Sequence, residues 1–209
     1  MPTTIMRRNR VSKKIRLATA QDLARIQEIY KPYVEQESIV VNSEHSVPTM
    51  EELKERFDLV TKECPWLVCE IDGKVAAYAY ASKPFKREGY KWNVELSIYA
   101  DGAYHGRRLA AALYESLIEI LKIQGYYNVY ACILSMNEKS LKFHEKYGFK
   151  VMTIFENVVY KYNQWFNVIW MKKTLKEFDK EPVEPIALGE IDEKIINDIL
   201  KKNEDIIKG

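Results

Sequence analysis

The chain is organised around residues 92–122, which read WNVELSIYA at 92–100, DGAYHGRRLA at 101–110 and AALYESLIEILK at 111–122. The first block is rich in β-forming residues, and the second is a short basic turn. The third block continues a set of apolar residues at helical spacing: Leu109, Leu113, Leu117, Ile120 and Leu121. The stretch therefore predicts a strand, a turn and an amphipathic helix whose apolar stripe faces the core.

The start of this helix is suited to binding a phosphate group. Backbone N–H groups in the first turn of a helix lack intrahelical partners, and the helix dipole makes that end partly positive. Arg107 and Arg108 add two positive charges at the same place. The pattern indicates a phosphate-bearing ligand. On spacing alone, the alternative is a solvated basic turn before an ordinary surface helix.

Composition restricts the class of protein. With 209 residues, 47% hydrophobic and 30% charged, the chain is long enough for one well-buried domain and an appendage. A net charge of +2 is too small to indicate nucleic acid as the main partner. No run reaches the length of a membrane span, and the basic N-terminus lacks the apolar segment of a signal peptide. We expect a cytoplasmic protein with no membrane partner.

The three cysteines show neither CxxC nor metal-type spacing, so no metal site is predicted. Cys69 and Cys132 lie inside apolar, strand-like runs. This position favours buried, inert thiols in a reducing compartment over a disulfide framework.

The remaining pattern mixes strands and helices. Strands are expected at residues 15–18, 66–71, 74–81, 91–100, 128–134, 150–155 and 166–174. Helices are expected after Thr19, from the capping box Thr49–Glu52 to Lys62, from 109 to Gly125, and from Asn137 to Gly148. Asp72-Gly73 predicts a hairpin between two strands. This order predicts an α+β fold, with a mixed sheet flanked by helices.

The two ends of the chain differ from the middle. Residues 1–13 read as a flexible basic leader, residues 14–175 as the main domain, and residues 176–209 as a linker followed by an amphipathic helix. The apolar positions of that last segment are Ile191, Ile195, Ile199, Leu200 and Ile206. We expect it to dock on its own domain, and a partner-binding helix is the alternative.

Several local patterns occur in an order typical of one superfamily. They are PWLV at 65–68 with DGKVA at 72–76, YKWNVE at 90–95, YHGR at 104–107, NEKS at 137–140 and FHEKYGF at 143–149. Over about residues 15–174 the chain resembles the GCN5-related N-acetyltransferase (GNAT) superfamily, and within it the phosphinothricin N-acetyltransferase group. The resemblance implies a mostly antiparallel, twisted sheet. It also implies a homodimer that transfers acetyl from acetyl-CoA to the primary amine of a small molecule.

The same resemblance implies where acetyl-CoA would bind. The backbone of Ile98, Tyr99 and Ala100 would lie along the pantetheine arm. Asn137 would bond that arm near its reactive end. The turn that would hold the pyrophosphate comprises Gly106, Arg107, Arg108, Leu109, Ala110 and Ala111.

Acetyl transfer needs a base for the ammonium, a donor for the thioester oxygen and an acid for the leaving thiolate. Glu95 lies in an apolar strand, where partial burial would raise its pKa toward neutrality. The family's proposed base, acting through water, matches Glu95. The alternative is a carboxylate that faces solvent or forms an ion pair.

His144 falls at the position that the resemblance assigns to the proton donor for the thiolate. Histidine suits this transfer because it titrates near neutrality. The alternative is a histidine that only packs or bonds the cofactor, and Tyr147 is a further candidate donor.

The sequence departs from the family pattern at three places. Arg108 stands where the superfamily turn has its first glycine, and a Cβ there would crowd a phosphate, so we expect retained but weaker CoA binding. Val41-Asn42 replaces the group's Phe-Arg, which removes an anchor for an anionic acceptor. Trp165-Phe166-Asn167 replaces Trp-His-Asp. The alternative functions are a non-catalytic acyl-CoA-binding or regulatory protein, and an acetyltransferase of a protein amine with the tail as docking element.

Overall fold

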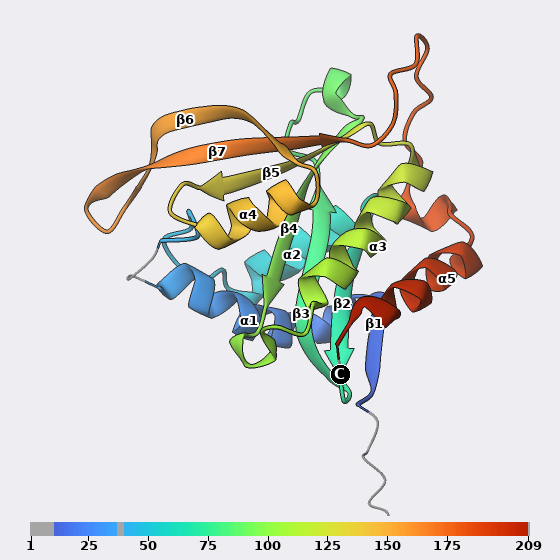
Figure 1. Cartoon of the computed structure of the whole chain (residues 1–209), viewed down its shortest axis with the longest axis horizontal. Helices are drawn as coiled ribbons and strands as arrows, with labels where there is room; N and C mark the ends of the chain where they lie inside the picture. Colours follow the sequence, from blue (N-terminus) through green and yellow to red (C-terminus); the bar gives the residue numbers. More distant parts are fainter. Residues whose placement is uncertain (1–10, 37–39, 209) are drawn as a thin grey trace, which may run out of the picture.

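A computed structural model describes residues 11–36 and 40–208. Its centre is one seven-stranded sheet in the order β1-β2-β3-β4-β5-β7-β6, shown in Figure 1. The strands are β1 (Lys13–Leu17), β2 (Trp66–Ile71), β3 (Lys74–Ser82), β4 (Asn93–Ala100), β5 (Asn128–Leu134), β6 (Lys150–Lys161) and β7 (Gln164–Thr174). Every neighbouring pair is antiparallel except β4 and β5. The predicted α+β fold with a mixed, mostly antiparallel sheet is confirmed.

Helices cover both faces of the sheet. They are α1 (Leu23–Glu35), α2 (Met50–Thr61), α3 (Leu109–Gln124), α4 (Glu138–Lys146) and α5 (Glu193–Asn203). One apolar cluster joins α1 and α2 to the sheet, and a larger cluster joins α3 and α5 to it. The predicted stripe of α3 is confirmed, because all five of its residues are buried.

Local signals act as expected at the turns and caps. Thr49 and Glu52 exchange hydrogen bonds between side chain and backbone, at 3.2 Å and 2.7 Å. Asp72 and Gly73 both have positive φ, 50° and 78°, which a tight two-residue hairpin requires. By contrast, β6 runs to Lys161, well beyond the predicted end at residue 155, and its hairpin with β7 projects from the molecule (Figure 1).

The strands β4 and β5 pair over a short distance and then part. The parallel register joins Asn93 to Asn128, Val94 to Val129 and Glu95 to Tyr130. Beyond that point β5 continues to pair with β7, whereas β4 continues to pair with β3. Figure 1 shows the two strands diverging. We call this divergence of the two strands the wedge; its apex lies at Glu95, and it widens toward Ala100.

The segment after residue 175 packs on the same core as the rest of the chain. Its helix α5 lies along α3, and its buried residues belong to the α3 cluster (Figure 1). The expected phase of the apolar face was wrong at one position: Ile195 is 44% exposed, and Ile196 is buried. Positions 196, 199, 200 and 203 share one face because they follow the i, i+3, i+4, i+7 spacing.

At the N-terminus, residues 1–10 of the predicted leader lie outside the described part of the chain, and Lys13 already belongs to β1. None of the helices within residues 11–36 and 40–208 combines the length and apolarity needed to cross a membrane.

Candidate active site

Glu95 lies at the apex of the wedge, as the last β4 residue in register with β5. Val94 and Leu96 on either side face the α3 cluster, so the alternation of a strand turns Glu95 toward the opposite face. Burial raises the pKa of Glu95 to about 7. The carboxylate is therefore partly ionised at neutral pH, a state suited to accepting a proton. The raised pKa agrees with the sequence prediction, whereas the role of base stays a prediction.

The edge of β4 that borders the wedge carries unusual backbone contacts at Ala100. The Tyr33 hydroxyl donates to the Ala100 carbonyl at 2.6 Å and accepts from the Ala100 N–H at 3.1 Å. The next residue, Asp101, instead donates its N–H to Ala76 on β3. Because backbone groups alternate along a strand, Ile98 turns its N–H and carbonyl to the same side as Ala100. The backbone groups of Ile98 and Ala100 thus face the wedge, and those of Ala100 are hydrogen-bonded to Tyr33.

The predicted pyrophosphate turn connects this edge to α3. Arg108 precedes the first residue of α3 and has left-handed dihedrals, φ 63° and ψ 24°. It is exposed, whereas Leu109 behind it is buried. The turn therefore keeps a left-handed conformation at the position where the superfamily has glycine. Arg108 therefore does not avoid the strain by adopting ordinary helical dihedrals.

We expect Arg108→Gly to raise the free energy of unfolding by about 1 kcal/mol, because left-handed dihedrals cost a residue with a Cβ roughly that much. Urea denaturation measures the change. Arg108→Ala is the matched control, since it removes the guanidinium but keeps the strained Cβ. An equal gain in both variants would show that charge, and not backbone strain, sets the effect.

Arg107 adds an observation that bears directly on an anion. Its guanidinium lies 5.7 Å from the centre of the Tyr104 ring. One of its nitrogens, Nη1, is buried and has no hydrogen-bond partner within the described residues. A buried donor without an acceptor is costly. A phosphate oxygen beside the first turn of α3 would satisfy it, so the residues of this turn fit the pyrophosphate of CoA.

His144 is buried on α4 and does not face solvent. Its Nδ1–H donates to the Ser140 carbonyl at 2.8 Å, so Nε2 carries the lone pair and accepts a short hydrogen bond from the Tyr114 hydroxyl. Burial lowers the pKa of His144 and raises that of Tyr114 well above its ordinary value. At neutral pH, a neutral imidazole therefore orients a protonated tyrosine.

Asn137 stands at the N-terminus of α4, across the wedge from β4. Its side-chain oxygen accepts from the Ser140 N–H at 3.1 Å and so caps the helix. The side-chain NH₂ is consequently the group with which Asn137 can donate to a ligand. Its predicted bond to the cofactor arm stays a prediction.

The face of the sheet opposite α3 gathers aromatic side chains beside Glu95. Trp170 lies 6.0 Å, centre to centre, from both Phe85 and Tyr130. The prediction that Cys132 is buried was wrong: it is exposed. Val129, Ala131 and Ile133 of β5 take the core face, so alternation directs Cys132 to the aromatic side, where β4 has already diverged.

The loop that carries Val41-Asn42 packs against this same face. Asn42 is buried and donates to the Tyr30 hydroxyl at 2.8 Å. Close by, Arg56 on α2 forms an ion pair with Glu44 at 2.9 Å. Both Arg56 and Glu95 act electrostatically on Tyr80, whose pKa is raised chiefly by burial. A cation and a carboxylate thus both lie near one tyrosine.

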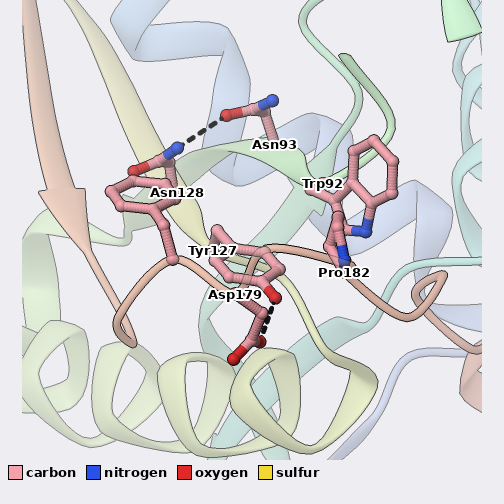
Figure 2. A pocket seen from close by; sticks show the side chains of 7 residues that line it. Trp92, Asn93, Tyr127, Asn128, Asp179 and Pro182 are labelled. Carbon is pink, nitrogen blue, oxygen red and sulfur yellow. Dashed lines mark hydrogen bonds between the residues drawn. The ribbon is translucent and has the colours of Figure 1, made fainter. Parts of the chain in front are cut away.

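A separate pocket of about 160 Å³ lies at the other end of the β4–β5 pair, shown in Figure 2. Trp92, Tyr127 and Pro182 form part of its wall, and the Tyr127 hydroxyl donates to Asp179. The indole N–H of Trp92 donates to the Val183 carbonyl at 2.8 Å. These contacts attach the linker after β7 to the sheet, and the pocket is not part of the wedge.

Comparison with known proteins assigns the family. The sequence model described as Acetyltransferase (GNAT) domain matches residues 15–170. The chain belongs to the GNAT acetyltransferase family. Its homologues carry the names of N-acetyltransferases, and the chain is accordingly an acetyl-CoA-dependent N-acetyltransferase of the phosphinothricin acetyltransferase-like group.

The match to individual relatives covers nearly the whole length of each relative. Phosphinothricin N-acetyltransferase of Streptomyces viridochromogenes is 30% identical over 180 residues, which cover 83% of this chain and 94% of the relative. L-methionine sulfoximine/L-methionine sulfone acetyltransferase of Salmonella typhimurium is 30% identical over 163 residues, which cover 78% of this chain and 95% of the relative. The crystal structure of a phosphinothricin acetyltransferase from Sinorhizobium meliloti in complex with acetyl-CoA superposes with a TM-score of 0.76 and 28% sequence identity. The match covers 83% of this chain and 95% of that chain.

The GNAT fold brings most of the predicted site residues to one place. Glu95, the β4 edge and the turn before α3 follow one another along the wedge, and α4 lies across it. Sequence reasoning missed Tyr33 and Tyr114, which act only through contacts between distant elements. For Tyr114 a signal existed, because a hydroxyl on the buried stripe of α3 needs a buried partner.

Proposed function

We propose that the chain acetylates the primary amine of a small, carboxylate-bearing molecule of the amino-acid class. The observation that carries the proposal is Glu95, a half-buried carboxyl with its pKa raised to about 7 at the apex of the wedge. A base with a pKa near the working pH combines a useful ionised fraction with proton affinity. Beyond Glu95 the edge of β4 is no longer paired with β5, and the resemblance places the cofactor along that edge.

The chain's own residues supply the proton transfers and the binding. Acetyl-CoA supplies a thioester whose acyl carbon the acceptor amine attacks. Glu95 takes the proton of the incoming ammonium through a water molecule. The Ile98 N–H faces the wedge and is suited to donate to an oxygen that gains negative charge. Arg107 and the first turn of α3 hold the pyrophosphate and thereby align the reactive end.

The acceptor class rests on charge and on relatives. Two relatives are named for phosphinothricin and for methionine sulfoximine or sulfone. The loop arginine of the phosphinothricin group is Asn42 here, and it is occupied by Tyr30. Arg56 supplies a cation on the same face, held by Glu44. This exchange favours a carboxylate-bearing acceptor other than phosphinothricin itself.

The first test mixes the purified protein with acetyl-CoA and a panel of amino acids, methionine sulfoximine and phosphinothricin, and follows release of the CoA thiol. Turnover of at least one small amine is expected. Binding of CoA without turnover of any small amine would replace the proposal with the non-catalytic alternative. Activity on a protein amine alone would favour the protein acetyltransferase.

The leaving thiolate takes its proton from the Tyr114–His144 pair in this proposal. Since Nε2 of His144 carries no proton, the Tyr114 hydroxyl is the proton donor: its O–H bond breaks as the S–H bond of CoA forms, and the phenolate that remains is reprotonated from solvent. We expect Tyr114→Phe to lower kcat at least tenfold at constant KM for acetyl-CoA. Tyr147→Phe, in the same aromatic cluster, tests the other candidate donor and should keep the wild-type kcat. Equal kcat in the wild type and in Tyr114→Phe would remove the pair from the mechanism.

We further propose a cytoplasmic homodimer and a division into leader, GNAT domain and tail at residues 13 and 175. The edge strand β6 supports the dimer, because it exposes Val151, Ile154, Phe155 and Val158. An exposed apolar edge of this kind pairs readily with a second copy. Sedimentation equilibrium tests it: a dimer is expected, and a monomer would contradict it. The free thiols of Cys64 and Cys69 agree with a reducing compartment.

A further inference from the structure

The C-terminal segment ends against the pyrophosphate turn. The backbone N–H of Lys208 donates to the Arg107 carbonyl at 2.9 Å. Ile207 beside it is only 2% exposed, and its carbonyl accepts from the Lys13 ammonium at 2.6 Å. The contact is therefore held by the burial of the Ile207 side chain and by the hydrogen bond to the Ile207 carbonyl.

The tail is fastened to α3 along the whole length of that helix. At the far end of α3, the Ile186 N–H donates to the Gln124 carbonyl at 2.9 Å. Near the middle, Asn203 donates to the Glu119 carboxylate at 3.1 Å. Figure 1 shows α5 running beside α3. The segment thus forms a strap from the C-terminal end of α3 back to the turn at its start.

The Lys208 contact acts on one particular peptide group. The Arg107 carbonyl and the Arg108 N–H belong to the same peptide, and in a trans peptide they point in opposite directions. Holding the carbonyl toward Lys208 aims the Arg108 N–H away from the tail. The bond therefore fixes the orientation of a donor in the turn where the buried Nη1 of Arg107 lacks a partner.

This turn needs such support more than the usual superfamily turn does. Arg108 keeps left-handed dihedrals, which cost a residue with a Cβ roughly 1–2 kcal/mol. Glycine adopts the same dihedrals without that cost. The tail lies outside residues 15–170, the part matched by the family model. The tail thus forms a hydrogen bond, from Lys208 to the Arg107 carbonyl, with the peptide group that precedes Arg108.

We propose that the C-terminal tail is a positioning element of the CoA site, which braces the Arg107–Arg108 peptide in the orientation that binds pyrophosphate. The inference rests on the proposed function, since it assumes that CoA occupies the turn. It assigns the tail to cofactor affinity and leaves acceptor recognition to the opposite face of the sheet.

Lys208→Pro tests the brace, because proline lacks the N–H. The preceding residue, Ile207, already has the extended dihedrals that proline requires, φ −71° and ψ 130°. Calorimetric titration with coenzyme A should show binding about fivefold weaker than in the wild type, the effect of one lost hydrogen bond. Steady-state kinetics should show a raised KM for acetyl-CoA, with kcat and the acceptor KM unchanged.

Two further variants make the result specific. Glu193→Pro places proline at the first position of α5, where no helical N–H is lost, and should bind coenzyme A like the wild type. Lys208→Ala keeps the N–H and removes the ammonium. A loss in Lys208→Ala as large as in Lys208→Pro would overturn the brace in favour of a direct charge contact. Wild-type affinity in Lys208→Pro would overturn it outright.

The failure of the proposed function gives a different result. A folded wild type that does not bind coenzyme A would refute the CoA site itself, and the brace with it. Binding by the wild type, together with equal binding by Lys208→Pro, would refute the brace alone. Melting temperatures of all variants, measured alongside, separate a loss of affinity from a loss of fold.

Discussion

Replacing Glu95 by glutamine is expected to lower kcat by about 10²–10⁴-fold, the usual contribution of a positioned base. Glutamine has the same shape as glutamate but cannot take the proton of the acceptor ammonium. The KM for acetyl-CoA should change little, because the pyrophosphate turn lies at the far end of the wedge. Steady-state kinetics with a turned-over amine measures both quantities.

The wild-type pH profile provides an independent check. The pKa of Glu95 is about 7, so kcat/KM should rise with pH below 7 and level off above it. Glu95→Gln should lose this rise. Glu55→Gln, an exposed glutamate on α2, is the matched control. Full activity in Glu95→Gln would remove Glu95 from the role of base.

The same substitution should make the protein more stable above neutral pH. Burial raises the folded pKa of Glu95 from 4.5 to about 7. Folding therefore favours the protonated carboxyl, and stability is lost as pH rises from about 4.5 through 7. The shift corresponds to about 3 kcal/mol. Glutamine remains neutral, so the free energy of unfolding of the variant should exceed that of the wild type at pH 8 by up to this amount.

Lys161→Met is expected to lower the free energy of unfolding by about 3 kcal/mol, the scale of losing hydrogen bonds to a buried charge. Lys161 is 2% exposed at the end of β6. Its ammonium donates to the carbonyls of Val34 at 2.7 Å, Glu44 at 2.6 Å and Asn42 at 3.3 Å. Methionine fills most of the space but leaves these carbonyls without a donor.

The substitution should also raise the KM for the acceptor, because Asn42 and Glu44 belong to the loop beside Arg56. Urea denaturation and steady-state kinetics measure the two effects. Lys150→Met, at the exposed start of the same strand, is the control and should stay within about 0.5 kcal/mol of the wild type. An equal loss in the free energy of unfolding in both variants would show that the buried hydrogen bonds of Lys161 do not cause the effect.

Periodicity and local chemistry predicted the parts of the fold that depend on neighbours in sequence. The α3 stripe repeats over four turns, and Asp72-Gly73 is a dipeptide typical of a two-residue hairpin turn between two strands. The prediction for Glu95 also came from its neighbours, since Val94 and Leu96 already implied a strand with one buried face. For residues of this kind, the adjacent sequence is enough to predict the environment of the side chain.

The residues that were missed or placed wrongly depend on contacts between distant segments. Cys132 sits in an apolar run like Cys69, but β4 diverges from β5 beside Cys132 and leaves it exposed. Lys161 reads as an ordinary strand lysine, and its three acceptors lie more than a hundred residues earlier. The hydrogen bond from Lys208 to Arg107 involves only backbone atoms, so no side-chain pattern in the sequence predicts it.

The short pairing of β4 with β5 also has a mechanical meaning. Among residues 11–36 and 40–208, only three register pairs join the strands β1–β4 to the strands β5–β7. Few backbone hydrogen bonds therefore join the two parts, and the apolar cluster under α3, which includes residues of both β4 and β5, holds them together. Lys161 adds a second link, from the β6–β7 hairpin to α1 and the loop at Asn42. The relative placement of the two parts thus depends more on core packing and on Lys161 than on strand pairing.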